Sequence, residues 1–94
     1  MHPLIAKHRK TILELAEKHG VYHVRVFGSM ARGDAGDGSD VDFLVALGEG
    51  RDYFDMGALL MDLQDLLQRK VDLVTEKGLH RAIREEVVSM AIPL

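Results

Sequence analysis

The chain of 94 residues contains no cysteine, so disulfides, thiolate nucleophiles and cysteine-based zinc sites are excluded. Long apolar runs are also missing, since none approaches the roughly 20 residues that a helix needs to cross a bilayer. Residues 1–10 lack the apolar segment of a secretory signal. We therefore expect a cytoplasmic protein without a membrane association.

Positive charge is scarce as well. Twelve Lys and Arg stand against fifteen Asp and Glu, for a net charge of −3. This balance argues against a protein that binds nucleic acid by neutralising phosphates. A composition of 47% hydrophobic and 29% charged residues is typical of a folded protein. Because domains average about 100–200 residues, residues 1–94 are expected to form a single domain.

Apolar periodicity and turn residues define the expected elements. Helical spacing predicts three main helices, over residues 3–19, 52–68 and 80–91. Strand-forming residues predict three strands, over residues 21–27, 40–47 and 71–75. The second and third strands are separated by a full helix and should be parallel, whereas the first two should be antiparallel. The expected fold is α/β, a small mixed sheet of about three strands with the helices packed on it.

Several residues refine these boundaries. Pro3 suits a first helical turn, and Asp52 is a suitable N-cap for the second main helix. The glycine-rich segment 28–39 reads as a loop, in which residues 29–32 could begin a short helix capped by Ser29. Leu59, Leu63 and their neighbours form a stripe that should cover the sheet. The last helix carries a shorter apolar series: Ile83, Val87 and Met90.

Three aspartates, Asp40, Asp42 and Asp72, occupy predicted strands, where Asp is depleted. An ionised carboxylate is costly in such a place unless it is paired or binds a metal. Asp40 and Asp42 are two residues apart, which puts them on one face about 6–7 Å from each other. If segment 71–75 pairs in parallel with segment 40–47, all three carboxylates meet near the strand starts.

Convergent carboxylates repel one another, and a divalent cation is the obvious remedy. Oxygen ligands without His or Cys favour Mg²⁺ or Mn²⁺. Two simpler interpretations stay open: Asp40 could end the loop as a turn residue, and Asp72 could cap the strand or pair with Lys70. Either suits a single aspartate, but three at this spacing favour a metal site.

Gly28 and Ser29 directly follow the first predicted strand. Backbone N–H groups and a hydroxyl at such a turn can hold phosphate oxygens if a helix starts there. Alone this dipeptide is a weak signal. Upstream of Asp40 and Asp42 it completes a pattern typical of phosphoryl or nucleotidyl transfer, in which positioning and charge neutralisation supply most of the catalysis.

Gly28-Ser29, ten further residues and then Asp40-Val41-Asp42 reproduce a GS-x10-DxD signature. On these motifs the chain resembles the minimal nucleotidyltransferases of the polymerase-β-type superfamily. It is most similar to the antitoxins of paired minimal-nucleotidyltransferase/HEPN toxin–antitoxin systems. The resemblance covers essentially the whole chain and implies a nucleotidyltransferase-type fold.

The resemblance also implies a role for each motif residue. Gly28 and Ser29 would contact the nucleotide triphosphate. Asp40 and Asp42 would hold the Mg²⁺ ions, two in number, that bridge the triphosphate and the attacking hydroxyl. Asp72 would be the third carboxylate, which binds the catalytic metal and helps to deprotonate the acceptor.

Arg32 matches the Ala-Arg-Gly run that is usual in this family. The resemblance allows it a contact with phosphate, and a structural salt bridge suits it equally well. For Asp72, the sequence leaves open whether it acts as a base or as a metal ligand alone.

The activity implied by the resemblance is transfer of AMP from ATP to a tyrosine of the partner HEPN ribonuclease, which silences that toxin. Chain length agrees, because 94 residues leave no second domain to hold an RNA or small-molecule acceptor. Two alternatives remain: a catalytically silent antitoxin that acts by binding alone, and a stand-alone enzyme that modifies a small molecule such as an aminoglycoside. Three retained aspartates favour catalysis. The sequence leaves open the nucleotide preference, the number of nucleotides added, the modified residue and the oligomeric state.

Overall fold

The computed structural model describes residues 1–36 and 38–94, and Asp37 of the predicted loop lies outside these. No helix in these two ranges is both long enough and apolar enough to span a membrane. The elements in chain order are α1 (Pro3–Lys18), β1 (Val21–Phe27), α2 (Ser29–Arg32), β2 (Val41–Leu47), α3 (Tyr53–Leu67), β3 (Val71–Val74), α4 (Arg81–Met90) and β4 (Ile92–Pro93).

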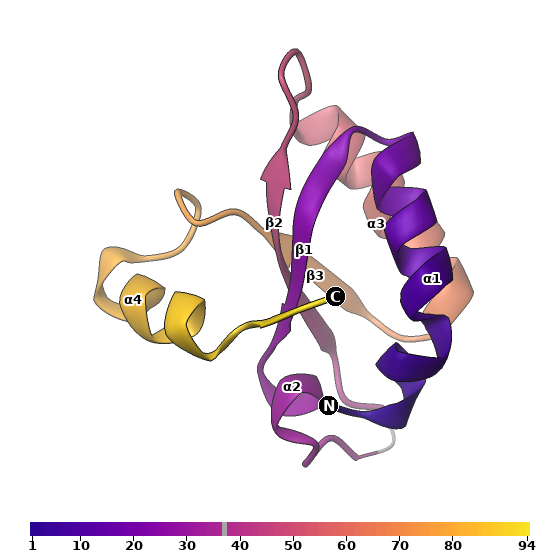
Figure 1. The fold of residues 1–94 in the computed structure, drawn as a ribbon, viewed down its shortest axis with the longest axis vertical. Helices are drawn as coiled ribbons and strands as arrows, with labels where there is room; N and C mark the ends of the chain where they lie inside the picture. Colours follow the sequence, from indigo (N-terminus) through magenta and orange to yellow (C-terminus); the bar gives the residue numbers. More distant parts are fainter. Residues whose placement is uncertain (37) are drawn as a thin grey trace.

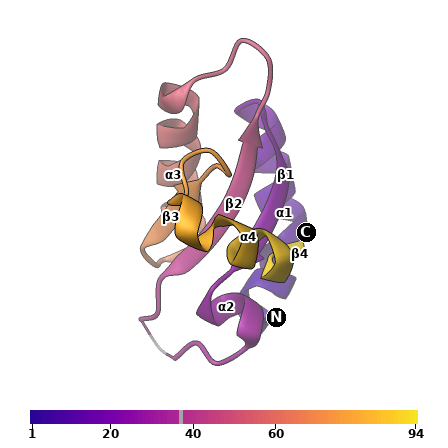
Figure 2. The same cartoon turned by 90° about the vertical axis from the view of Figure 1, so that its left-hand side faces the viewer.

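The strands form one sheet in the order β3-β2-β1-β4. Helices α1 and α3 lie against one face of this sheet, and α4 stands on the opposite side (Figures 1 and 2). The apolar core fills the space between the sheet and the helix pair α1/α3. Its fully buried members include Ile5, Ile12, Val26, Val41 and Phe43.

The predicted helices and strands are confirmed with small shifts at their ends. Pro3 is the first residue of α1, as its fixed φ favours. Asp52 caps α3 through the N–H groups of Phe54 and Asp55, and the Asp55 side chain accepts from the Asp52 N–H in return. The predicted stripe covers the sheet as expected, with Met56, Leu59, Leu63 and Leu67 buried.

The predicted pairing directions are confirmed as well, since β1 and β2 are antiparallel and β2 and β3 are parallel. The expected α/β fold, a small mixed sheet with helices packed on it, is confirmed, and the described part of the chain has four strands and four helices. Helix α2 is the short helix that residues 29–32 allowed, and β4 is an addition to the three expected strands. Strand β4 pairs antiparallel with β1, with Ile92 opposite Val26. A two-residue strand that ends in proline is too short to be predicted from its own residues. It is a strand only because it pairs with β1.

Two expectations about element ends are wrong in detail. Gly28, rather than Ser29, is the N-cap of α2, and no side chain in the described residues caps this helix. Asp40 lies just outside β2, which begins at Val41.

Strand β1 contains a bulge at His23, whose φ is +50°. The register slips here: Tyr22 lies opposite Ala46, but Arg25 lies opposite Leu44. One extra residue therefore resets the alternation along the strand. Regular alternation would have turned Arg25 towards the core, and the bulge places it on the face that carries α4 instead.

Candidate active site

Two of the predicted site residues are brought together by the pairing of β2 with β3. Asp42 and Asp72 are direct partners in the parallel register. Val41 and Phe43, the neighbours of Asp42, are fully buried against the helices. Alternation therefore directs Asp42 to the other face of the sheet, where it is half-buried beside the exposed Asp72.

The electrostatics of this pair are unfavourable for two free carboxylates. Burial raises the pKa of Asp42 above the usual 3.8, and the negative charges of Asp72 and Asp40 raise it further. The positive charge of Arg32 opposes this effect. A divalent cation would relieve the same repulsion without a proton, and the oxygen donors of two adjacent carboxylates fit Mg²⁺.

Asp40 lies near this pair, but its side chain forms an ion pair with Lys70. Its Oδ2 lies 4.0 Å from Nζ of Lys70, and both side chains are largely exposed. The ion pair with Lys70 thus belongs to Asp40, and not to Asp72. As the side chains stand, no group of three His, Asp or Glu residues among residues 1–36 and 38–94 is arranged to hold a metal ion. Since an exposed ion pair contributes about 0–1 kcal/mol, Asp40 can leave Lys70 at little cost.

Gly28 shapes the turn between β1 and α2. Its φ of +72° and ψ of −152° belong to a region that is nearly exclusive to glycine. A Cβ at this position would lie 2.5 Å from Oδ2 of Asp42. Glycine is therefore required twice, for the conformation of the turn and for the close approach of its backbone to the carboxylate.

Ser29 and Arg32 stand at the two ends of α2. Ser29 is the first residue of the helix, so its N–H group has no acceptor in a preceding turn. Arg32 is exposed and its Nε donates to Oδ2 of Asp34 over 3.1 Å. Arg32 therefore makes the salt bridge that was one of its two interpretations, and it is also near enough to lower the pKa of Asp42.

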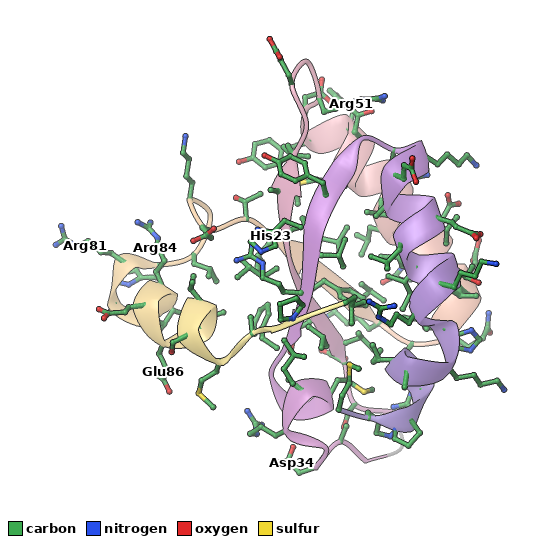
Figure 3. All side chains as sticks on the ribbon, in the orientation of Figure 1. His23, Asp34, Arg51, Arg81, Arg84 and Glu86 are labelled. Atoms are coloured by element: carbon green, nitrogen blue, oxygen red, sulfur yellow. The ribbon has the colours of Figure 1, made fainter. Side chains whose placement is uncertain are left out.

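A cavity of about 290 Å³ opens beside Gly28. Its walls come from the end of β1, from α2 and from α4, and its lining residues are Phe27, Gly28, Ala31, Arg32, Glu86, Val87 and Met90. Figure 3 shows Glu86 on the edge of α4 nearer to α2, whereas Arg81 and Arg84 project from other parts of the helix. Sequence reasoning assigned no site role to α4, because Val87 and Met90 follow the spacing of a core stripe.

Sequence reasoning also assigned no role to Arg25. Its side chain is on the same face as Asp42 and is only 4% exposed. Its Nη1 lies 3.5 Å from Oε2 of Glu76, and its Nε donates to the carbonyl of His23. The ion pair with Glu76 links Arg25 to the segment that connects β3 to α4. The bulge that places it there has no sequence signal beyond a histidine in a strand.

Comparison with known proteins gives a consistent result. Residues 8–93 match the family model described as a nucleotidyltransferase domain. The chain is 38% identical over 85 residues to the protein adenylyltransferase MntA of Thermococcus cleftensis, an alignment that covers 90% of this chain and 83% of the relative.

Two solved structures have the same fold. The structure of a minimal nucleotidyltransferase superposes with a TM-score of 0.87 and 46% identity, covering 100% of this chain and 97% of the other. A chain from the crystal structure of a toxin–antitoxin with AMP-PNP superposes with a TM-score of 0.74 at 23% identity, covering 89% of this chain and 69% of that chain.

Proposed function

The chain belongs to the nucleotidyltransferase domain family, and on this premise we propose that it is an antitoxin that transfers AMP from ATP to a tyrosine of a partner HEPN ribonuclease. The observation that carries the proposal is the parallel register that sets Asp42 beside Asp72, next to the turn at Gly28. The adenylyltransferase name of a 38% identical relative supports AMP as the group transferred. One structure with the same fold is a chain from a toxin–antitoxin complex, and this supports a toxin as the acceptor of AMP.

The roles of the carboxylates follow from their positions. Asp42 and Asp72 would hold Mg²⁺, and Asp40 would join them after leaving Lys70. The metal supplies neutralisation of the triphosphate charge. Asp72 is the exposed member of the pair, so the acceptor hydroxyl reaches it first and can pass it a proton. The hydroxyl oxygen then bonds to the α-phosphorus and pyrophosphate leaves.

The turn after β1 would hold the triphosphate. The backbone of Gly28 lies close to Asp42, so phosphate oxygens bound at this turn also lie close to the carboxylates. The Ser29 hydroxyl is not used as a helix cap and can donate to phosphate. Arg32 would add a positive charge at the edge of the site, in exchange for its exposed pair with Asp34. We place this reaction in the cytoplasm, where ATP and a ribonuclease toxin meet.

The test is mass analysis of the partner encoded by the adjacent reading frame, after incubation with this protein, ATP and Mg²⁺. We expect the intact mass of the partner to rise by whole AMP units, and tandem fragmentation to place them on tyrosine. Asp42→Asn and Asp72→Asn should each abolish the mass shift. Asp65→Asn is the matched control, because Asp65 is an exposed residue of α3 on the other side of the sheet.

Two results would count against the proposal. Labelling that survives Asp42→Asn and Asp72→Asn would remove these carboxylates from the chemistry. Neutralisation of the toxin without any mass shift, equal for the wild type and both variants, would show the silent antitoxin that acts by binding alone.

A further inference from the structure

Helix α3 carries apolar side chains on the side that it turns away from the sheet. At the helical spacing i, i+4, i+7 and i+11, this side consists of Phe54, Ala58, Met61 and Asp65. Phe54 is 89% exposed and Met61 is 61% exposed. Figure 2 shows α3 at the margin of the molecule. An aromatic residue and a methionine aligned on one uncovered helix face are typical of a protein–protein interface.

This outer α3 face, residues 54, 57, 58, 61 and 65, is self-complementary under a two-fold rotation. Two copies of α3 can pack antiparallel with the centre of the contact between Gly57 and Ala58. Phe54 and Met61 are equally far from that centre along the helix. Phe54 of each copy then lies opposite Met61 of the other, which is the relation that a two-fold dimer interface requires.

The middle of the outer α3 face has little side-chain bulk. Gly57 is exposed in the interior of the helix, where glycine is less favourable than alanine. A Cβ at Gly57 would meet no described atom within 4 Å, and its φ is not in the left-handed region. No contact within the described chain therefore requires this glycine. Beside Ala58 it allows a second helix to approach closely, since the interaxial distance depends on the side chains at the contact.

The charges beside this face also match in the antiparallel arrangement. The Arg51 side chain lies where a Cβ on Gly20 would point, and Asp62 hydrogen-bonds to His19. Both side chains are therefore on the flank of α3 next to the end of α1. With the two-fold centre between residues 57 and 58, Arg51 of one copy lies about 3 Å along the axis from the level of Asp62 of the other. Opposite charges thus meet at each end of the contact.

The area of the outer α3 face sets the strength of such a contact. A buried aromatic side chain removes about 150–250 Å² from water, so the two Phe54 rings supply about 300–400 Å². The neighbouring side chains add to this, but the total stays below the roughly 1,200 Å² of a standard interface. This area suits a reversible dimer with a dissociation constant on the order of 10–100 µM.

We propose that the outer α3 face is a dimer interface and that its occupant is a second, antiparallel copy of this chain. The proposal goes beyond the proposed function and does not depend on it, because no candidate catalytic residue takes part. Helix α3 and Asp42 lie on opposite faces of the sheet, so both candidate sites of the dimer face outward. Each site stays open to its acceptor while the two chains are joined.

The lack of cysteine allows a direct test by cross-linking. Ala58→Cys and Asp65→Cys each place one thiol on the same exposed side of the same helix. In the proposed dimer, the two thiols of Ala58→Cys are about 1.5 Å apart along the axis, and those of Asp65→Cys are about 22 Å apart. With diamide as the oxidant, Ala58→Cys should form a disulfide-linked dimer at least about tenfold faster than the matched control Asp65→Cys, because only its thiols are within disulfide reach.

Sedimentation equilibrium tests the contact without a cross-link. Wild-type protein should dimerise reversibly, and Phe54→Ser should raise the dissociation constant at least about tenfold, because two rings per dimer are no longer buried. Ile83→Ser is the matched control, since Ile83 is an exposed apolar residue of α4 on the other side of the sheet. It should leave the dissociation constant unchanged. Circular dichroism checks that both variants are folded.

Three results would overturn the proposal: a wild-type chain that is monomeric at millimolar concentration, equal cross-linking of Ala58→Cys and Asp65→Cys, and a dimer that is indifferent to Phe54→Ser. Maleimide labelling adds one more outcome. If the thiol of Ala58→Cys is protected only when the protein from the adjacent reading frame is bound, the outer α3 face belongs to that partner and the dimer is refuted. AMP transfer is measured separately, so its failure leaves these results unaffected.

Discussion

The two faces of the sheet are covered in different ways. The face against α1 and α3 is closed by apolar side chains, and Val26, Phe43 and Val45 are almost completely buried there. The opposite face carries Asp42, Asp72 and the buried Arg25. Helix α4, all of whose residues the structure describes, buries none of its side chains. The first face therefore contributes most of the apolar core, and the second is covered less completely.

Strand β2 shows how one short segment serves both purposes. Successive side chains of a strand point to opposite faces, so Phe43 enters the core while Asp42 and Leu44 face the site side. Leu44 is itself fully buried, and Leu79 is 8% exposed. The site side thus has a small apolar centre of its own, with charged groups around it.

The largest effect on this comparison should come from truncation of Phe43. Phe43→Ala removes a fully buried ring from the core face and should lower the free energy of unfolding by about 3–5 kcal/mol. Because a small domain has about 5–15 kcal/mol in total, this variant should be close to unfolding. Urea denaturation measures the loss.

Leu44→Ala is the counterpart on the site face. We expect a loss near the lower end of the range for buried leucine, about 2–3 kcal/mol, because the thinner cover on this face can relax into the space. A loss equal to that of Phe43→Ala would show that the two faces contribute alike.

Substitution of Gly28 should damage both the turn and the site. Gly28→Ala forces a side chain into a backbone conformation that costs about 1–3 kcal/mol, and its Cβ would press on the carboxylate of Asp42. We expect reduced stability together with loss of nucleotidyl transfer, measured by denaturation and by label transfer from ATP.

Gly33→Ala is the matched control for that variant. Gly33 also has a positive φ, +80°, but a Cβ there would meet no described atom within 4 Å. It should cost about 1–2 kcal/mol for the left-handed backbone alone and leave activity intact. Equal loss of activity in the two variants would contradict the role given to the contact between Gly28 and Asp42.

Asp42→Asn should abolish transfer and yet stabilise the metal-free protein at neutral pH. The pKa of Asp42 is raised in the folded state by burial and by Asp72 and Asp40, so the folded protein binds this proton more tightly than the unfolded chain does. Wild-type stability should therefore fall as the pH rises through the pKa of Asp42, and the variant should lack this decrease.

The measurement is a series of thermal melts between pH 4 and pH 8 in the presence of a chelator. A melting temperature that is lower for Asp42→Asn than for the wild type at pH 8 would contradict this prediction. It would show that burial and charge repulsion of the Asp42 carboxylate do not destabilise the fold. Mg²⁺ should reduce the difference between the two proteins, because it relieves the same repulsion.

The smallest expected effect is at the contact between α1 and α3. Nε2 of His19 lies 2.7 Å from Oδ2 of Asp62, and this hydrogen bond lowers the pKa of Asp62. A lowered pKa stabilises the fold above the unfolded value of 3.8 and the gain is lost as the pH falls below it.

Asp62→Asn should therefore reduce the melting temperature slightly at pH 6, and the difference should vanish towards pH 3. Nucleotidyl transfer should be unaffected, because α1 and α3 lie on the far side of the sheet from the candidate site. A loss of transfer would mean that the helix face and the site face are coupled.

Much of this architecture could be predicted from local patterns. The stripe from Met56 to Leu67 and the run Val71–Val74 indicate a helix and a strand directly, and their order indicates a parallel crossover. That single deduction already brings Asp72 next to Asp42. The pairing of Asp42 with Asp72 could therefore be predicted from the sequence alone.

What could not be predicted depends on contacts between distant segments. Strand β4 forms because Ile92 pairs with Val26, which lies more than sixty residues earlier in the chain. The Asp40 side chain turns to Lys70 because parallel pairing brings the residues before β2 and β3 together, as the hydrogen bond from Val41 N–H to the Lys70 carbonyl shows. The position of Val87 in the wall of the cavity beside Gly28 is equally non-local, since its spacing along α4 fits a core residue as well as a cavity wall.

The bulge at His23 divides β1 into two halves whose inward and outward positions are out of phase. Deletion of His23 would remove the one extra residue, so Val24 would follow Tyr22 directly and the alternation would become regular. Tyr22 and Arg25 would then keep the faces of the sheet that they occupy now. The expected consequence is a straighter strand with less local twist, without any exchange between the core face and the site face.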